Sequence, residues 1–325
     1  MIKTKAIAKV DNSSIISVEN FGDIAIEGFI ASRHSSPNTA KTYRNSIRQL
    51  LKYFAAQAIT APTTADVDNF INKLRADKKS DSTIRLYSTT TKLFFNYLEK
   101  QGVYKNVAAQ MAPLKLRKAT THKKKSLSDA QAKKLLAVVK GSDIISLRNK
   151  AIIALALTTG LRTCEISRAN VGNFQEVDGY WTLDVQGKGH IQADATVKVA
   201  TPVAELINNY LDARAGVALD EPLFTSTSRN TGWKANTYGV RYSEQSIGKM
   251  IKAAMLAAGI VDKKITAHST RHYAATTAIK AGIDIREVAA MLRHTSIVIT
   301  SVYLHDLSLQ TRRAELAVAN KLFCA

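Results

Sequence analysis

Six side chains in the second half of the sequence have the chemistry to cleave a phosphodiester without a metal ion. They are Arg162, Lys188, His268, Arg271, His294 and Tyr303. The planar guanidinium of arginine matches the non-bridging oxygens of a phosphate, and histidine can add a further donor. A tyrosine hydroxyl can attack phosphorus if the developing charge is stabilised, and a lysine can protonate the leaving oxygen. The set therefore predicts transesterification by electrostatics and positioning.

Taken singly, these residues also have ordinary structural explanations. Arg162 could form a helix-end salt bridge with Glu165, the lysine could be a turn residue, and the tyrosine could be a core aromatic. His268 and His272 are spaced i, i+4 and could bind zinc, but no carboxylate lies between them and no third ligand is obvious. The joint arrangement favours phosphodiester chemistry, and we expect neither a metal ion nor another cofactor.

The charge of the chain favours a polyanionic partner. The 325 residues include 46 Lys+Arg against 26 Asp+Glu, a formal net charge of +20. Cations that neutralise phosphates release condensed counterions, so this surplus favours nucleic acid, although ribosomal, membrane-surface and heparin-binding proteins share it.

The sequence shows no clear signal for secretion or for insertion into a membrane. Its 2 cysteines cannot form a disulfide framework, and the first residues lack the apolar segment of a secretory signal. The longest apolar run is too short to span a bilayer. We therefore expect a cytoplasmic protein with no membrane association.

Apolar residues recur at helical spacing up to Gly102 and predict four helices. Ser36-Pro37 is a helix start, with serine as N-cap and proline at the first helical position. Gly102 is suited to follow the last of the four helices. Cations on the opposite faces are either a solvated surface or a DNA-binding one. Given the net charge, we predict that the following cations face DNA: Lys41, Arg44, Arg48, Lys52, Arg85 and Lys92.

The stretch 113–126, PLKLRKATTHKKKS, has no hydrophobic period and marks a domain boundary. It is either a localisation-like basic patch or a linker that crosses a DNA backbone, and we favour the linker. Its predicted DNA-binding residues are Lys115, Arg117, Lys118, Lys123, Lys124 and Lys125. The expected organisation is a tail (1–16), a helical DNA-binding domain (17–112), the linker (113–126) and a second domain (127–325).

The second domain is predicted to be mostly helical with a small antiparallel sheet. Ser128 and Gln131 form a capping box, and a later helix ends at Gly160 before a short helix near 164–168. The segments GYWTLDV and ATVKVAT predict two strands around the turn QGKGH, whose tip carries Lys188. A further helix opens at 201–202, and three or four more helices complete the chain.

Five short stretches of this domain carry the six candidate residues in a characteristic order. They are TGLRTCEIS, GKG, HSTRH, MLRHTS and VYLH. Their order and spacing match an arginine, a hairpin lysine, an H-x-x-R motif, a histidine and a nucleophilic tyrosine. The sequence thus resembles the tyrosine recombinases of the phage integrase family over about 127–305, and the helical domain resembles that family's core-binding domain. The implied fold is mainly α with a small antiparallel sheet, in which a four-helix core-binding domain precedes an α+β catalytic domain.

The resemblance implies site-specific recombination of double-stranded DNA through a 3′-phosphotyrosyl intermediate. Tyr303 would attack the scissile phosphorus, while the two arginines and His294 would hold the charged transition state. Lys188 would protonate the leaving 5′-oxygen, and His268 would support proton transfer and positioning. The phosphotyrosine would retain the bond energy, so rejoining would need no ATP.

The resemblance also implies an assembly on DNA. A homotetramer would act on two DNA sites, and the protein could be either a monomer or an oligomer in solution. The segment 307–322 would form a helix that docks on a neighbouring copy. The short N-terminal tail suggests the simple two-domain type without a separate arm-binding domain. The alternatives are a type IB topoisomerase, which would relax DNA as a monomer, and a non-catalytic DNA-binding protein.

One residue departs from the family pattern. The family usually has Leu-Gly-His where this chain has Leu292-Arg293-His294. An arginine there lacks the backbone freedom of glycine and adds a cation near the site. Either altered local packing or a phosphate contact would follow, so we expect a changed level of activity with the same chemistry.

Overall fold

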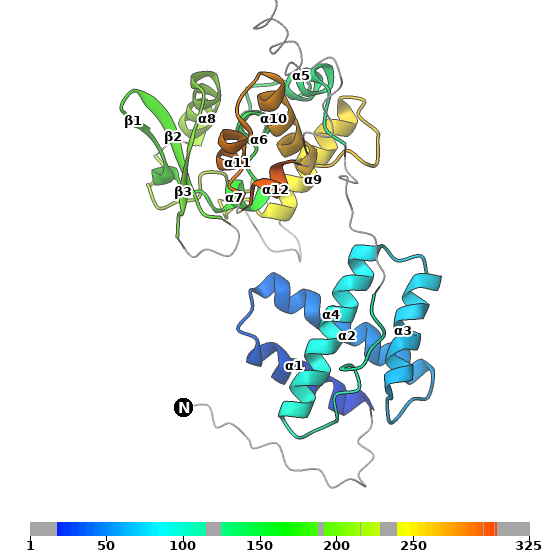
Figure 1. The fold of residues 1–325 in the computed structure, drawn as a ribbon. Helices are drawn as coiled ribbons and strands as arrows, with labels where there is room; N and C mark the ends of the chain where they lie inside the picture. The colour runs from blue at the N-terminus through cyan, green and yellow to red at the C-terminus, as the bar shows by residue number, and fades with distance from the viewer. Residues whose placement is uncertain are drawn as a thin grey trace, which may run out of the picture. The chain divides into compact units, whose positions relative to one another are not determined.

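The computed structural model describes residues 18–114, 125–187, 192–214, 216–227, 239–294, 296–301 and 303. The chain divides into two compact units, Met1–Lys118 and Ala119–Ala325 (Figure 1). The division falls within the basic stretch 113–126.

The first unit is built from four helices. They are α1 (Val18–Ser32), α2 (Pro37–Ala56), α3 (Thr64–Ala76) and α4 (Asp81–Lys100) (Figure 1). Each buries an apolar face in one core, where the rings of Phe29 and Phe94 meet edge-on at 5.7 Å between centroids. Ser36 caps α2 by accepting a hydrogen bond from the backbone of Thr39, and Gly102 follows α4 at a φ of 67°. The four predicted helices are therefore present, with the predicted start at Pro37.

The second unit contains the remaining helices of the described chain. They are α5 (Asp129–Ala137), α6 (Ile144–Thr159), α7 (Thr163–Arg168), a 3-10 turn (Val171–Asn173), α8 (Thr201–Arg214), α9 (Glu244–Ala257), α10 (His268–Lys280), α11 (Ile285–Met291) and α12 (Ile297–Ser301). Helix α6 is the centre of the unit, because every residue from 151 to 157 is buried and α8, α9 and α10 pack around it.

A three-stranded antiparallel sheet lies at one edge of this unit, beside α8 (Figure 1). Its strands are β1 (Phe174–Val177), β2 (Tyr180–Val185) and β3 (Ala195–Lys198), in the order β1-β2-β3. The register is illustrated by Leu183 of β2, which pairs with Phe174 of β1 and with Val197 of β3. The mainly α fold with a small antiparallel sheet is confirmed, but the sequence predicted only two of the three strands.

None of the described helices combines the length and the hydrophobicity needed to cross a bilayer.

Candidate active site

The site begins at the turn that ends α6. Gly160 has a φ of 64°, in the left-handed region that favours glycine. A β-carbon at this position would lie 2.8 Å from Cδ2 of Leu292, so packing also requires glycine. The chain then passes directly into α7, with Arg162 as the N-cap residue. The glycine that ends one helix therefore positions the arginine that starts the next.

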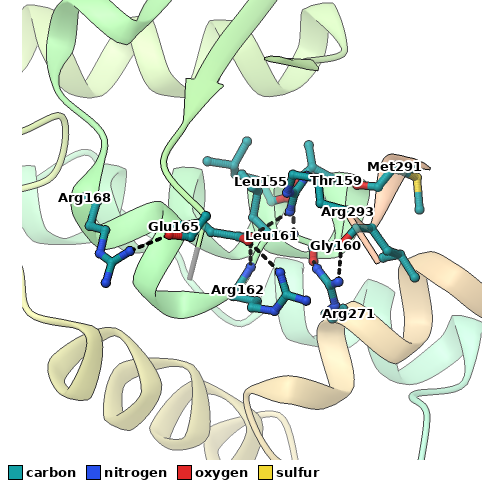
Figure 2. Close-up of polar contacts among 12 residues, drawn as sticks. Leu155, Thr159, Gly160, Leu161, Arg162, Glu165, Arg168, Arg271, Met291 and Arg293 are labelled. Carbon is teal, nitrogen blue, oxygen red and sulfur yellow. Dashed lines mark hydrogen bonds and ion pairs between the residues drawn. The ribbon is translucent and has the colours of Figure 1, made fainter. Parts of the chain in front are cut away.

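Arg271 lies in the first turn of α10, which begins at His268. The residue is 1% exposed. Its Nη1 donates to the Gly160 carbonyl at 2.7 Å (Figure 2). Its Nη2 donates to the Leu292 carbonyl. Burial, followed by repulsion from Arg162, lowers the pKa of Arg271 to about 10. Arg271 therefore remains charged at neutral pH, at the point where α6 and α10 meet the end of α11.

Glu165 is a fully buried carboxylate that holds Arg162. Its Oε1 accepts from Nη1 of Arg162 at 2.7 Å, and its Oε2 accepts from the backbone N of the same residue at 2.7 Å (Figure 2). Burial acts to raise the pKa of Glu165, but the charge of Arg293 and the hydrogen bonds from Arg162 outweigh it and hold the pKa below its usual value. Glu165 is thus ionised and orients the guanidinium of Arg162.

Arg293 adds a further cation to the same carboxylate. Its φ is 54°, so an arginine adopts the conformation that the usual glycine would take. Its Nη2 donates to Oε2 of Glu165 at 2.6 Å, and its Nη1 donates to the Met291 carbonyl at 2.9 Å (Figure 2). The side chain of Arg293 thus turns inward to Glu165, in line with the altered local packing that was one of the two expectations from the sequence.

His294 follows Arg293 and is partly buried. Its Nδ1 lies 2.7 Å from Oγ1 of Thr300, a buried residue of α12. Burial, and then the positive charges of Arg271, Arg162 and Arg293, lower the pKa of His294 to about 4. The imidazole is therefore neutral at neutral pH and can act as a hydrogen-bonding group toward a phosphate.

Tyr303 completes the described cluster and is 2% exposed. Its ring is nearly parallel to that of His294, at an interplanar angle of 5° and a centroid distance of 6.3 Å. Its ring also meets that of His272 edge-on, at a shorter centroid distance of 5.1 Å, and His272 in turn lies 5.1 Å from His268. The predicted tyrosine and both predicted histidines therefore belong to one set of contacting rings.

Five of the six predicted residues come together, and Lys188 lies outside the described residues. The residue before it, Gly187, is held at both backbone groups. Its N–H donates to Oδ1 of Asp194 at 2.5 Å, and its carbonyl accepts from Nη1 of Arg168 at 2.8 Å. The last residue of α7 therefore contacts the residue that immediately precedes Lys188 in the sequence.

Comparison with known proteins identifies the family. Residues 125–309 match the phage integrase family, and residues 26–102 match the phage integrase N-terminal SAM-like domain. The chain belongs to the phage integrase family. The prediction that it is one of the family's tyrosine recombinases is thereby confirmed. These enzymes cleave and rejoin DNA in site-specific recombination.

Several relatives of this phage integrase family member are recombinases. The chain is 29% identical to the tyrosine recombinase XerD of Oceanobacillus iheyensis over 293 residues, which cover 87% of this chain and 94% of that protein. The fold resembles that of the XerH recombinase in a post-cleavage complex with a palindromic difH substrate, with a TM-score of 0.68, 20% identity, and coverage of 94% and 84%. It also resembles a lambda integrase tetramer bound to a Holliday junction, with a TM-score of 0.64, 17% identity, and coverage of 90% and 78%. These relatives offer no support for the topoisomerase or the non-catalytic alternative.

The predicted DNA-facing cations of the integrase's first unit differ in their surroundings. Arg44 forms two hydrogen bonds to Glu27 of α1, at 2.6 and 2.7 Å, and Arg48 pairs with Asp23 at 3.3 Å. The positive charges of Arg44 and Arg48 are therefore paired with carboxylates of α1. The other four occupy exposed positions of α2 and α4: Lys41, Lys52, Arg85 and Lys92.

The linker cations can be followed only at one end. Lys125 pairs with Asp262 at 3.2 Å and donates its backbone N–H to the carbonyl of Lys264. The others lie outside the described residues: Lys115, Arg117, Lys118, Lys123 and Lys124. The predicted docking helix, 307–322, also lies outside them.

Three residues of the site were not assigned a role from the sequence. Glu165 was considered only as a salt-bridge partner of Arg162, and its spacing of three residues was the available signal. His272 was considered as a zinc ligand, whereas its buried ring packs against Tyr303. Arg293 was noticed as a departure, but the direction of its side chain depends on a contact 128 residues away.

Proposed function

We propose that this recombinase cleaves DNA with Tyr303 as the nucleophile and with Arg162, Arg271 and His294 as the groups that bind the scissile phosphate. The observation that carries this proposal is the junction at Gly160. There the carbonyl of the turn holds Arg271, and the next helix starts with Arg162. Two guanidiniums from distant parts of the chain thereby reach one small region, beside His294.

The cleavage step follows from these groups. The Tyr303 oxygen forms a bond to phosphorus as the bond to the 5′-oxygen breaks, which leaves a 3′-phosphotyrosyl link and a 5′-hydroxyl. The pentacoordinate transition state carries more negative charge than the diester, so fixed cations stabilise it more than the ground state. His268 supports removal of the tyrosine proton, and Lys188 donates a proton to the leaving oxygen.

Rejoining is the same reaction in reverse. A 5′-hydroxyl from a partner strand attacks the phosphotyrosine, and Tyr303 leaves with its proton restored. Because one phosphoester replaces another, the exchange needs no ATP. The neutral His294 can donate a hydrogen bond to the phosphate in both directions, since its low pKa keeps it uncharged across the neutral range.

Tyr303 must be uncovered before it reacts. The residue is 2% exposed, packed with Val288 and Leu292 in a small apolar cluster. Its side chain is almost wholly buried in this arrangement, whereas a nucleophile must meet the phosphorus atom directly. We therefore place a local rearrangement around α11 and α12 before the attack on DNA.

We further propose that four copies act on two duplex sites, in the cytoplasm. A recombinase must hold four DNA ends while strands exchange, and the similar fold of lambda integrase is found as a tetramer on a Holliday junction. The exposed cations of α2 and α4 would contact phosphates, together with those of the linker.

The test starts from the DNA site. Duplexes that bind the wild-type protein are selected from a random pool, and the recovered site is made into a suicide substrate with a nick near the cleavage point. We expect Tyr303→Phe to bind this DNA with wild-type affinity and to form no covalent adduct on a denaturing gel. An adduct at the wild-type level would remove Tyr303 from the role of nucleophile.

A further inference from the structure

Arg293 occupies a backbone position that favours glycine. The N–H of His294 bonds to the Ala289 carbonyl at 3.0 Å, and the N–H of Arg293 bonds to the Ala290 carbonyl at 2.9 Å. This pair of bonds is the Schellman cap of α11, with Arg293 in the left-handed position at a φ of 54°. A side chain with a β-carbon is disfavoured there, so contacts of the arginine must offset the strain.

Those contacts direct the guanidinium inward. The side chain of Arg293 is 11% exposed, with Nη1 on the Met291 carbonyl and Nη2 on Glu165 (Figure 2). The side chain of Arg162, by comparison, is 28% exposed. Of the two arginines bound to Glu165, Arg162 is therefore the one open to a DNA phosphate.

The number of cations that neutralise the Glu165 carboxylate depends on Arg293. Arg162 already bonds to both oxygens of the carboxylate, through Nη1 and through its backbone N–H. If these were its only charged contacts, the buried Glu165 would cancel much of the positive charge of Arg162. With Arg293 on Oε2, a second cation compensates the carboxylate, and the charge of Arg162 remains to stabilise a phosphate.

We propose that Arg293 is a positioning residue for DNA cleavage: it compensates and fixes the buried carboxylate of Glu165, and thereby keeps Arg162 oriented and fully charged toward the scissile phosphate. This inference rests on the proposed phosphate-binding role of Arg162. It assigns a function to the residue at which this chain departs from the Leu-Gly-His pattern, and that function does not involve contact between Arg293 and DNA.

Arg293→Gly is the informative variant, because glycine is the residue that the cap of α11 favours. The cap, and with it the backbone position of His294, should persist while the cation is lost. We expect the rate of covalent adduct formation to fall by roughly 10- to 100-fold, the scale of a small misplacement of a reacting group. DNA affinity should change little, because Arg162 and Arg271 remain. Arg293→Lys, which keeps a cation that can reach Glu165, should recover much of the rate.

The pH profile provides a readout that a purely structural role would not alter. Burial acts to raise the pKa of Glu165, and Arg293 is the leading charge that opposes it. Without Arg293 the carboxylate becomes protonated at a higher pH, and its hold on Arg162 is lost there. The fall in cleavage rate on acidification should therefore begin at a higher pH in Arg293→Gly than in the wild type.

A double-mutant cycle with Glu165→Gln separates positioning from direct phosphate binding. The amide that replaces the carboxylate has no negative charge for Arg293 to compensate, so Arg293→Gly should add little to the defect of Glu165→Gln. Arg286→Ala, which removes an exposed cation from the same helix α11, is the control for loss of nearby positive charge and should cleave at the wild-type rate.

Two results would overturn the proposal. One is wild-type cleavage by Arg293→Gly; the other is an Arg293→Gly defect of the same size in the Glu165→Gln background, which would mean that Arg293 acts on DNA directly. If circular dichroism shows that Arg293→Gly does not fold, Arg293→Gln replaces it, since that side chain keeps most of its length and loses the charge. Tyr303→Phe in the same assay separates the two proposals, because adducts from that variant would contradict the nucleophile and not the role of Arg293.

Discussion

Arg271 donates a 2.7 Å hydrogen bond from its buried guanidinium to the carbonyl oxygen of Gly160. The two residues are 111 positions apart in the sequence, so this bond joins the first turn of α10 to the end of α6. The carbonyl is available because the glycine takes a left-handed conformation as the helix ends. The conformation of one glycine therefore determines where two arginines of the site lie.

Substitution of Gly160 tests this relationship. Gly160→Ala places a β-carbon 2.8 Å from Leu292 and forces alanine to a φ of 64°. We expect the free energy of unfolding, measured with urea, to fall by more than the roughly 1 kcal/mol that the backbone conformation alone costs. The rate of adduct formation should fall as well, because both arginines depend on this turn.

Gly179→Ala is the matched control for that experiment. Gly179 has a φ of 78° in the turn between β1 and β2, and an added β-carbon would meet nothing within 4 Å. Gly179→Ala should thus show the backbone cost alone and unchanged cleavage. Equal destabilisation in the two variants would mean that the contact with Leu292 relaxes without cost.

The low pKa of His294 predicts a dependence of stability on pH. The pKa falls from its ordinary value of 6.5 to about 4 in the folded protein, so between these values the unfolded chain binds more protons than the folded one. The stability conferred by the neutral ring is present above pH 6.5 and is lost as the pH falls toward 4. Unfolding free energies across this range should decrease more steeply for the wild type than for His294→Gln. Parallel pH curves for the two proteins would contradict the lowered pKa.

The role of Lys188 can be separated from that of a phosphate ligand by changing the leaving group. An alkoxide needs a proton to depart, and general acid catalysis is typically worth about 10²–10⁴-fold. Lys188→Ala should therefore cleave normal DNA about 10²–10⁴-fold more slowly than the wild type. It should cleave a 5′-phosphorothiolate substrate near the wild-type rate, because a thiolate leaves without a proton.

Arg162→Ala is the control for this rescue. Its loss affects the charge on the non-bridging oxygens, so sulfur at the 5′ position should not restore its rate. If sulfur leaves the defect of Lys188→Ala unchanged, the proton donor is another group, and His190 and His268 are the next candidates.

Much of the fold follows from local signals in the sequence. The helix start at Ser36-Pro37 and the end of α6 at Gly160 were predictable because caps depend on a few adjacent residues. Strand β1 was missed for a local reason too. It has four residues, only Phe174 among them is buried, and so it has no alternating pattern. The Asp178-Gly179 turn after it, with both φ values positive, was the available hairpin signal.

The residue types of the candidate site were predictable from the sequence. The contacts that hold those residues in place were less so. Motif order indicated Arg162, Arg271 and Tyr303, because each has a side chain suited to a chemical role that few others can fill. It could not show that Glu165 holds two arginines at once, since the contact with Arg293 joins residues 128 positions apart. Contacts of that range follow from packing, and no local pattern in the sequence records them.

Helix α7 connects Arg162 to the residue that precedes Lys188 over a short distance. Arg162 precedes its first residue, and its last residue, Arg168, contacts the carbonyl of Gly187 immediately before Lys188. Its 6 residues rise about 9 Å along the axis. An insertion or deletion within α7 would change the spacing between Arg162 and Gly187 and rotate one relative to the other. With Lys188 in its proposed role, the length of this helix is a geometric constraint on cleavage, and we expect it to tolerate less variation than the surface loops of the second unit.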